Sequence, residues 1–394
     1  MPMSYAREIV GQFLDAVGKK PVIILYGARQ VGKTTFVKSI LGRFKNPAYI
    51  QCDDPKEAAR LTHRSVPELL DLVVGHDVVV LDEAQRIPDI GTTLKLIADN
   101  ARGVQVIATG SSSFELANKL NEPLTGRNRK FLLYPLSVRE LIYTRGLRDT
   151  ESQLETLLLY GMYPQIVSAE NATDKRTFVS ELAQDYLFRD LFMLGDIRNP
   201  FAFEKLVKLL AVRVGSEISY AELGKEAGVS RDTVFQYITL LERAFITFRL
   251  TPHWRNKNKE IVKSHKVYFY DTGVRNALIG NFDPLELRAD KGALFENFCV
   301  AEKMKRRGYA AEPYDAHFWR TRAGAEVDFV EIRSGGNDIR GFECKWKAGA
   351  GAPRPWQADY PHASFTLLTS DTAIKHLTED EVAIQKLREK HHVG

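Results

Sequence analysis

The sequence has 394 residues, more than one hydrophobic core usually serves, and it therefore predicts two to four domains. Apolar residues make up 44% and charged residues 27%, a balance that excludes an intrinsically disordered chain and is typical of soluble globular proteins. The net charge of +5 permits nucleic-acid binding without requiring it, and because no apolar run approaches 18 residues, no membrane span is expected.

The cysteines and the first residues bear on location. Cys52, Cys299 and Cys344 lie far apart and match no metal-ligand spacing. Thiols without a disulfide pattern favour a reducing compartment. Residues 1–20 carry acids and lack a long apolar core, so they do not predict a signal peptide. A cytoplasmic location is therefore expected.

The first third of the chain alternates apolar strands with amphipathic helices. A helical pattern over residues 4–17 comes first. Strands are then predicted at PVIILY (21–26), HDVVVLDEA (76–84) and VQVIATG (104–110), and helices at FVKSILGRF (36–44), SVPELLDLVVG (65–75) and TTLKLIADNA (92–101). This alternation predicts a parallel sheet covered on both faces, over residues 1–130.

Three further parts are expected after this one. Residues 131–198 are helical throughout, which favours a helical lid. Residues 199–272 predict a helix-turn-helix followed by a basic hairpin, and residues 273–394 predict a long helix at 292–308 and a β-meander through AEVDFVEI and GFECKWKA. The expected fold class is a multidomain α/β protein.

Residues 27–35, GARQVGKTT, form the clearest motif. They fit G-x-x-x-x-G-K-T and stand between a strand and a helix, the context that a phosphate-binding loop requires. Backbone N–H groups of such a loop surround the phosphates at the positive end of the helix. Lys33 is expected to reach the β- and γ-phosphates and the Thr34 hydroxyl to bind Mg²⁺. The predicted nucleotide contacts are Gly27, Ala28, Arg29, Gln30, Val31, Gly32, Lys33, Thr34 and Thr35, although Arg29 could instead face solvent.

A second motif, VVVLDEAQ, complements the loop. Its apolar residues place Asp82 and Glu83 at the carboxyl end of a strand, where ligands bind in parallel sheets. Asp82 is expected to hold Mg²⁺, and Glu83 to polarise the attacking water as the catalytic base. The next strand ends in TGSSSFEL, where Thr109 or Ser111 could sense the γ-phosphate or a serine could cap the following helix.

These stretches carry a resemblance. GARQVGKTT, VVVLDEAQRIPD, IATGSSSFEL and LTGRNRKFLLYPLSVREL, in this order, resemble the AAA+-type ATPases of bacteria and archaea. The resemblance implies ATP as the nucleotide, consistent with a chain that lacks the guanine-reading Asn-Lys-x-Asp set. It also implies a ring, with a hexamer as the default, and an arginine finger at Arg127. A lone arginine in a loop is, alternatively, surface decoration.

The segment AELGKEAGVSRDTVFQYITLLE predicts a helix-turn-helix, with Gly228 in the turn and Ser230 capping the second helix. Arg231, Gln236 and Tyr237 are expected on its outer face. The next segment supplies Arg255, Lys257, Lys259, Lys263 and Lys266, which favours a winged helix that contacts DNA phosphates without reading sequence. A protein-adaptor role, or packing against the ATPase core, is the alternative.

Carboxylates gather in the last part of the chain. Because side chains alternate along a strand, Glu326 and Asp328 should share one face, opposite Val327 and Phe329. Glu343 and Lys345 should likewise share a face, with Cys344 opposite, and Glu296 could approach from the preceding helix.

An Asp followed by Glu-x-Lys resembles the PD-(D/E)XK nuclease fold, a restriction-endonuclease-like α/β domain. The resemblance implies that Glu296, Asp328 and Glu343 bind a second Mg²⁺ and that Lys345 helps to activate water. A surface network of ion pairs, or a platform that holds DNA without cutting it, remains the alternative.

Three functions follow from these patterns. The leading one is an ATPase that hydrolyses Mg-ATP and remodels or translocates on DNA, with branched DNA among the candidate substrates. The second is an ATP-dependent DNA nuclease. The third is a nucleotide-dependent switch that binds a protein partner.

Overall fold

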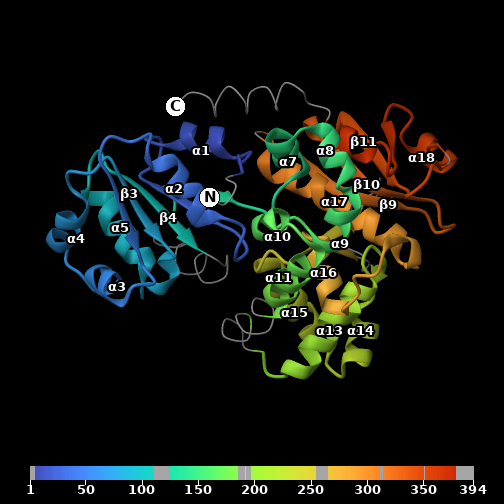
Figure 1. The fold of residues 1–394 in the computed structure, drawn as a ribbon, viewed down its shortest axis with the longest axis horizontal. Helices are drawn as coiled ribbons and strands as arrows, with labels where there is room; N and C mark the ends of the chain where they lie inside the picture. Colours follow the sequence, from blue (N-terminus) through green and yellow to red (C-terminus); the bar gives the residue numbers. More distant parts are fainter. Residues whose placement is uncertain are drawn as a thin grey trace. The chain divides into compact units, whose positions relative to one another are not determined.

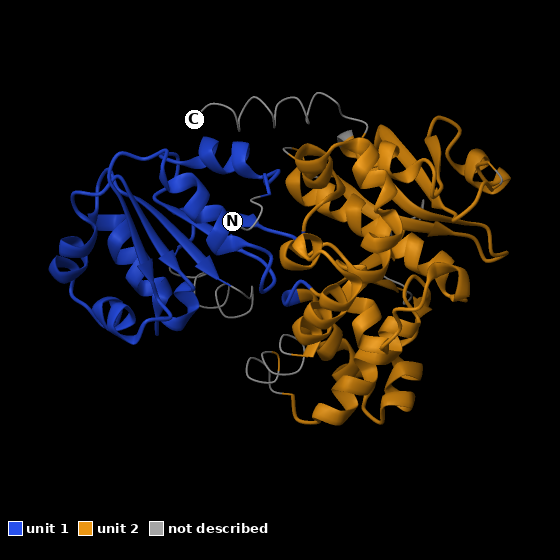
Figure 2. Cartoon of the chain, viewed as in Figure 1, with its two compact units in different colours: residues 1–135, 243–245, 385–394 blue, residues 136–242, 246–384 orange. Residues whose placement is uncertain are grey.

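The structure is a computed structural model that describes residues 5–110, 124–184, 191, 197–253, 265–310, 312, 314–349 and 351–378. The chain forms two compact units (Figures 1 and 2). The first comprises residues 1–135, 243–245 and 385–394, and the second comprises residues 136–242 and 246–384. The first unit extends beyond the predicted boundary at residue 130 because strand β5 (Asn128–Leu132) belongs to its sheet.

The first unit is built on a parallel sheet in the order β2-β3-β4-β1-β5. Its other strands are β1 (Val22–Tyr26), β2 (Pro47–Gln51), β3 (Val78–Asp82) and β4 (Gln105–Gly110). The three predicted strands form the centre of the sheet, and β3 and β4 are buried along their whole length. The sequence did not reveal β2 and β5, because these edge strands are partly exposed and lack a continuous apolar run.

Helices cover both faces of this sheet, as expected. They are α1 (Val10–Ala16), α2 (Lys33–Leu41), α3 (Pro55–Leu61), α4 (Val66–Val73), η1 (Ala84–Arg86) and α5 (Ile90–Asn100). On one face, Leu69 of α4 and Leu94 of α5 pack in one cluster with Leu81 of β3. Elsewhere in the unit, the ring of Phe13 on α1 lies 5.1 Å from the rings of Phe36 and Phe131.

The second unit contains a seven-stranded sheet in the order β12-β11-β10-β9-β7-β8-β6. Its strands are β6 (Glu217–Ile218), β7 (Thr247–Pro252), β8 (His265–Phe269), β9 (Asp315–Arg320), β10 (Glu326–Arg333), β11 (Asp338–Cys344) and β12 (Ser364–Leu368). Strands β9, β10 and β11 form the predicted antiparallel meander. Strand β7 pairs with β9, so one sheet runs across the predicted domain boundary between residues 272 and 273.

Besides the short turn η5 (Ser334–Gly336), the described part of the second unit contains helices. They are α7 (Val138–Arg145), α8 (Leu147–Ser152), α9 (Leu154–Tyr160), α10 (Pro164–Ser168), α11 (Ala172–Gln184), α13 (Pro200–Val212), α14 (Tyr220–Ala227), α15 (Arg231–Arg243), α16 (Thr272–Ile279), η4 (Leu285–Leu287), α17 (Lys291–Tyr309), α18 (Arg354–Asp359) and α19 (Ala373–His376). Helices α14 and α15 flank the predicted turn, in which Gly228 has a φ of 75°. Helices α9 and α11, from the segment predicted as a lid, pack against α16.

Helix α17 is tied to the sheet by a buried amide. The Asn297 side chain accepts a hydrogen bond from the Phe269 N–H at 2.8 Å and donates one to the Phe269 carbonyl at 3.0 Å. Asn297 has no exposed surface, so its amide satisfies both backbone groups of the last residue of β8 where water does not reach.

Replacement of this amide should be costly. We predict that Asn297→Ala lowers the free energy of unfolding by about 2 to 4 kcal/mol, because a buried donor and a buried acceptor lose their partners. Denaturant unfolding of the full chain measures the change. Asn100→Ala, which removes an exposed amide from the end of α5, is the control and should stay within about 0.5 kcal/mol of the parent. An equally small effect at Asn297 would contradict the prediction.

Candidate nucleotide site and carboxylate cluster

The phosphate loop runs from the end of β1 to the start of α2. Gly32 caps α2 with a φ of 94°, a left-handed conformation that glycine adopts without strain. A Cβ atom added to Gly27 would lie 2.2 Å from the Leu133 carbonyl oxygen, so only glycine fits there. No described side chain caps α2, so the N–H groups of its first turn are available to an anion.

Lys33 lies inside this loop. Its ammonium group donates hydrogen bonds to the carbonyl oxygens of Gly27 at 3.1 Å and Ala28 at 2.9 Å. Burial lowers its pKa to about 8, although the Glu83 and Asp82 carboxylates oppose that shift. A buried ammonium held by neutral carbonyls suits an exchange of partners with phosphate oxygens.

Asp82, at the end of β3, joins three hydroxyl groups. Its Oδ2 accepts hydrogen bonds from Thr34 Oγ1 at 2.7 Å and from the Tyr49 hydroxyl at 2.5 Å, and its Oδ1 accepts one from Thr109 Oγ1. Strands β2 and β4 flank β3 and supply Tyr49 and Thr109, while α2 supplies Thr34. Carboxylate and hydroxyl oxygens are the ligands that Mg²⁺ prefers, so Thr34 and Asp82 fit the expected metal.

Glu83 has an unusual backbone. Its φ of 55° and ψ of 41° are left-handed, which is uncommon for a residue with a side chain. The Gln85 amide donates a hydrogen bond to the Glu83 carboxylate, and the Glu83 N–H donates one to Thr109 Oγ1 at 3.0 Å. Strained backbone of this kind is frequent at functional sites. The strain and the Gln85 contact together fix where the Glu83 carboxylate lies.

Sequence reasoning missed Tyr49 and Gln85. Gln85 comes two residues after Glu83 in DEAQ, so its closeness to the Glu83 carboxylate could have been inferred from the sequence. Tyr49 lies on an edge strand that the sequence did not reveal, and its contact with Asp82 depends on the β2–β3 pairing. Burial, together with the hydrogen bond to Asp82, raises the Tyr49 pKa, so its hydroxyl stays a donor.

The other residues predicted for the nucleotide site differ in their contacts and in how exposed they are. Arg127 pairs with Asp99 of the same unit, with 2.6 Å between Arg127 Nε and Asp99 Oδ1. Thr109 is fully buried against Asp82. Arg29 is half-buried, whereas Gln30 and Thr35 are exposed. Ser111 lies outside the described residues.

The predicted DNA contacts are only partly on the surface. Arg231 and Gln236 are exposed on α15, but Tyr237 is 5% exposed and its ring packs edge-to-face on Phe203 at 5.1 Å. The expectation for Tyr237 was therefore wrong, because position 237 falls in the buried stripe formed by Val234, Ile238 and Leu241. The predicted contacts Arg255, Lys257, Lys259 and Lys263 lie outside the described residues.

The structure brings the predicted carboxylates of the second unit together. Glu296 of α17 and Glu326 of β10 both form ion pairs with Lys266 of β8, and Asp328 Oδ1 lies 4.0 Å from the Lys266 ammonium. Glu343 Oε1 lies 2.9 Å from the Lys345 ammonium. Lys266 is 3% exposed, so it does not belong to an exposed basic hairpin as the sequence indicated.

The electrostatics of this carboxylate cluster follow from burial. Burial and the neighbouring Glu296 and Glu343 carboxylates raise the pKa of Asp328 well above its usual value. Burial works against the Lys266 ammonium, but Glu296, Asp328 and Glu326 outweigh it and raise the Lys266 pKa. Among the described residues, no group of three or more His, Cys, Asp or Glu side chains is arranged to hold a metal ion.

A bulge changes the predicted alternation in β10. The pairing with β9 shifts between Val327 and Val330, so one extra residue lies on β10. Val327 consequently packs in the same cluster as Val330 and Trp356, rather than sharing a face with Phe329 as expected. Asp328 lies within the bulge, where its Oδ2 accepts a hydrogen bond from the Cys344 N–H at 2.8 Å.

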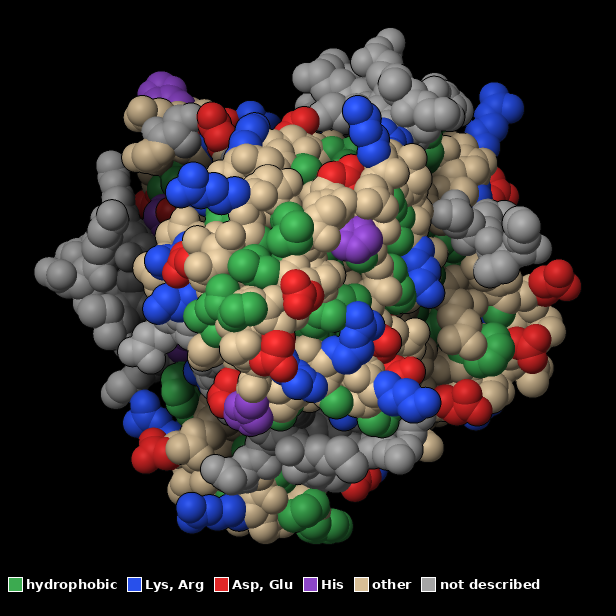
Figure 3. All heavy atoms as spheres, turned by 90° about the vertical axis from the view of Figure 1, so that its left-hand side faces the viewer, with side chains coloured by type: hydrophobic (Ala, Val, Ile, Leu, Met, Phe, Trp, Pro, Cys, Tyr) green, Lys and Arg blue, Asp and Glu red, His purple; other side chains and the backbone are tan. Residues whose placement is uncertain are grey.

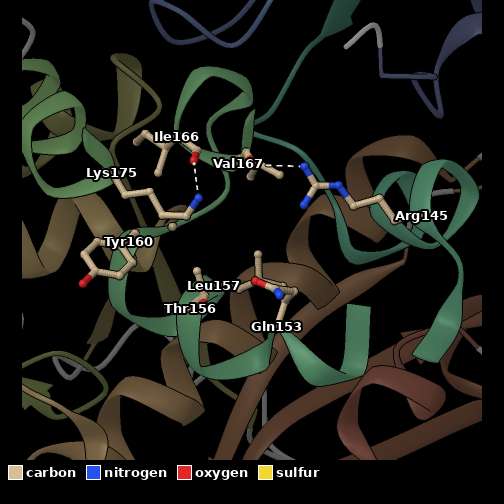
Figure 4. A pocket seen from close by; sticks show the side chains of 9 residues that line it. Arg145, Gln153, Thr156, Leu157, Tyr160, Ile166, Val167 and Lys175 are labelled. Carbon is tan, nitrogen blue, oxygen red and sulfur yellow. Dashed lines mark hydrogen bonds between the residues drawn. The ribbon is translucent and has the colours of Figure 1, made fainter. Parts of the chain in front are cut away.

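The second unit also contains a small cavity beside α9, α10 and α11 (Figure 4). Its volume of about 20 Å³ holds one water molecule and no nucleotide. Arg145 donates a hydrogen bond to the Val167 carbonyl at 2.9 Å, and Lys175 donates one to the Ile166 carbonyl at 3.4 Å. Both cations thus satisfy carbonyls near the end of α10, and burial with the nearby Arg145 charge lowers the Lys175 pKa.

No described helix is both long and apolar enough to cross a membrane. Comparison with protein families matches residues 19–142 to the AAA domain, residues 151–285 to a domain of unknown function (DUF8612) and residues 291–358 to another (DUF4143).

Relatives match most of the chain. The "Uncharacterized protein Rv2008c" of Mycobacterium tuberculosis is 30% identical over 343 residues, which cover 86% of this chain and 73% of that protein. The "Uncharacterized protein MJ1544" of Methanocaldococcus jannaschii is 26% identical over 331 residues, covering 78% and 71%. Among solved structures, the Walker-type ATPase paby2304 of Pyrococcus abyssi is 16% identical with a TM-score of 0.49, covering 70% of this chain and 98% of that one.

The Tyr49 contact predicts a change in metal dependence. We expect Tyr49→Phe to raise the Mg²⁺ concentration for half-maximal nucleotide turnover about tenfold, because a hydrogen-bond partner that orients a metal ligand is lost. Turnover at saturating Mg²⁺ should change little. Tyr160→Phe, which removes a hydroxyl from the second unit, is the control. Equal Mg²⁺ titrations for Tyr49→Phe and the parent would contradict the assignment.

Proposed function

The chain belongs to the same family as Rv2008c of Mycobacterium tuberculosis and carries a P-loop ATPase domain of the AAA type, and from this premise we propose that it hydrolyses Mg-ATP and uses the energy to remodel or move along DNA. The observation that carries the ATPase assignment is the network around Asp82. It joins the phosphate loop, through Thr34, to the end of β3 that carries Glu83.

Each residue of the site has a distinct role in this proposal. The Lys33 ammonium binds the β- and γ-phosphates in exchange for its two carbonyl partners. Thr34 and Asp82 would hold Mg²⁺, which would supply positive charge to neutralise the phosphates. Glu83, oriented by Gln85, accepts a proton from the attacking water. Thr109 contacts both Asp82 and the Glu83 N–H, which suits a residue that senses the γ-phosphate.

The segment that follows β5 offers a route from the nucleotide site to the second unit. Within the first unit, Arg7 donates hydrogen bonds to the Val31 carbonyl in the phosphate loop, at 2.6 Å, and to the Tyr134 carbonyl, at 2.5 Å. The chain passes from the first unit to the second between Pro135 and Leu136.

Helix α17 holds the far end of that segment. Within the second unit, the Lys305 ammonium donates a hydrogen bond to the Leu136 carbonyl at 2.9 Å, and Glu302 Oε2 accepts one from the Val138 N–H at 2.7 Å. A change in the phosphate loop on hydrolysis would therefore pull on a segment anchored to the helix that also carries Glu296. This anchoring supports a coupling of ATP turnover to the second unit.

DNA contact is proposed through the second unit. Arg231 and Gln236 are exposed near the start of α15, the helix that would enter a groove in a helix-turn-helix. Figure 3 views the molecule from the side on which Figure 2 draws the first unit, and there Lys and Arg side chains are interspersed with Asp and Glu rather than gathered into one basic patch. We therefore propose that DNA binds without sequence preference to the exposed side chains of α15 and, from the sequence alone, to the basic residues at 255–263.

A ring with Arg127 as arginine finger belongs to the same proposal. Arg127 is 39% exposed and its partner Asp99 38% exposed. An ion pair so exposed contributes about 0–1 kcal/mol, so Arg127 can leave Asp99 for a neighbouring subunit's phosphate at little cost. A hexamer is the proposed assembly.

The first test is steady-state ATP hydrolysis, alone and with single-stranded, duplex and four-way-junction DNA. We expect DNA to stimulate turnover and the best stimulator to identify the substrate. Lys33→Ala should abolish nucleotide binding and turnover. Glu83→Gln should bind ATP normally but turn it over at least about 100-fold more slowly, because the base is lost. An inactive parent protein, or full activity in either variant, would refute the ATPase assignment.

Arg231→Glu tests the DNA surface separately. We expect this change to reduce the stimulation by DNA and leave the basal rate unchanged, because a phosphate contact becomes repulsive. Arg148→Glu makes the same charge change on the exposed surface of α8 and is the control. An equal loss of stimulation in both variants would argue against α15 as the DNA-binding helix.

Exposed apolar residues favour a second candidate, the switch that binds a protein partner. Phe201 is 78% exposed and Val212 64% exposed, both on α13, and Phe235 is 48% exposed on α15. Turnover that does not respond to any of the three DNAs would favour this candidate over the DNA motor.

A further inference from the structure

The carboxylate cluster of the second unit already contains a cation. The Lys266 ammonium lies 3.2 Å from Glu296 Oε1, forms an ion pair with Glu326 Oε1 and lies 4.0 Å from Asp328 Oδ1. The Tyr268 hydroxyl donates a hydrogen bond to the same oxygen of Glu296 at 2.7 Å. These contacts join β8 to α17 and β10.

Lys266, which provides the cation, lies on β8, a strand that is not adjacent to β10 in the sheet. Strands β9 and β7 lie between β10 and β8 in the sheet order, a separation of about 14 Å in a flat sheet and more than a lysine side chain spans, so the sheet must bend to bring Lys266 to Glu326. Its ammonium lies 5.4 Å from the centre of the Phe318 ring on β9, a favourable position for a cation over an aromatic face. The ammonium is thus surrounded by three carboxylates and an aromatic ring, and its side chain is 3% exposed.

The Mg²⁺ implied by the nuclease-like pattern does not fit these residues. Mg²⁺ requires close to six oxygen ligands in octahedral geometry, and Ca²⁺ needs at least as many. Lys266 stands where Glu296, Glu326 and Asp328 converge, while Glu343 is engaged by Lys345 and Asp328 Oδ2 by the Cys344 N–H. The described residues contain no group of three or more carboxylate, imidazole or thiol side chains that could hold a metal ion.

We propose that the Lys266 ammonium takes the place of the divalent cation in this cluster. The second unit then carries a nuclease-like arrangement without its metal, whose carboxylates hold β8, α17 and β10 together and do not cut DNA. The sequence resemblance did not reveal the contact of Lys266 with these carboxylates. The Glu-x-Lys motif is a short stretch of sequence, whereas Lys266 lies in a segment that the sequence assigns to a different domain.

Manganese uptake by the full-length, nucleotide-free chain tests the proposal. Free Mn²⁺ is measured by electron paramagnetic resonance for the parent and for Asp328→Asn. Because Asp82 is present in both proteins, Mn²⁺ bound at the nucleotide site contributes equally to the two measurements. We expect equal uptake by the two proteins. Uptake by the parent that Asp328→Asn abolishes would overturn the proposal, as would Mn²⁺-dependent nicking of a supercoiled plasmid that Asp328→Asn removes.

Removal of the ammonium gives the complementary test. We expect Lys266→Met to bind one additional Mn²⁺ and to lose it again when Asp328→Asn is added. Its melting temperature should fall, because the three carboxylates lose their cation, and Mn²⁺ should restore part of that loss without affecting the parent. A folded Lys266→Met that takes up no more Mn²⁺ than the parent would overturn the claim that the ammonium replaces a metal.

Two controls separate this result from folding defects. Lys208→Met removes an exposed ammonium that pairs with Glu204 on α13, and it should change neither Mn²⁺ uptake nor the melting temperature. If Lys266→Met does not fold, Glu296→Gln replaces it in comparison with the parent. Equal Mn²⁺ uptake by parent, Asp328→Asn and Glu296→Gln supports the proposal, and reduced uptake in both variants overturns it.

Discussion

The carboxylate of Asp82 is the point on which the nucleotide site depends. A buried carboxylate is stable only when hydrogen-bond donors replace the water it has lost, and Asp82 obtains three such donors from Thr34, Tyr49 and Thr109. Those hydroxyls come from α2, β2 and β4. The same contacts that make burial tolerable therefore fix the phosphate loop beside the strand that carries Glu83. The sheet order sets this geometry, because β2 and β4 flank β3 and supply two of the three hydroxyl groups.

Buried charge organises the second unit in a comparable way. Lys305 and Glu302 anchor the segment after Pro135, Arg275 and Arg288 both pair with Asp290, and Lys266 gathers the carboxylates near α17. Desolvation makes such pairs a weak source of net stability, but loss of one partner is severe. These networks therefore specify which elements pack together. The Lys266 ion pairs add a side-chain link between the helix-turn-helix segment and the C-terminal strands, which the β7–β9 pairing already joins.

The sequence predicted the features that depend on local patterns. The phosphate loop, the strands β1, β3 and β4 and the helices α14 and α15 follow from apolar runs and from glycine or capping residues. The edge strands β2 and β5 escaped notice because partly exposed strands need no apolar run. Tyr49 was missed for the same reason.

Other features depend on pairings between distant residues. Tyr237 is different, because position 237 completes the i, i+3, i+4, i+7 spacing of Val234, Ile238 and Leu241, so the helical pattern itself places it on the buried face. Lys266 looked like part of an exposed basic segment, and only its ion pairs in the folded chain show that it lies beside Glu326, although β8 and β10 are not neighbours in the sheet order. A bulge in β10 similarly altered the expected alternation around Asp328. For Lys266 and for the bulge, no local pattern carries this information.

The most direct measurement is calorimetric binding of a non-hydrolysable ATP analogue to the full chain, with and without Mg²⁺, for the parent and for Asp82→Asn. If Asp82 links the phosphate loop to the metal, the parent binds more tightly with Mg²⁺ and Asp82→Asn binds with an affinity that Mg²⁺ does not change. Absence of nucleotide binding by the parent, or the same Mg²⁺ effect in both proteins, would contradict the account.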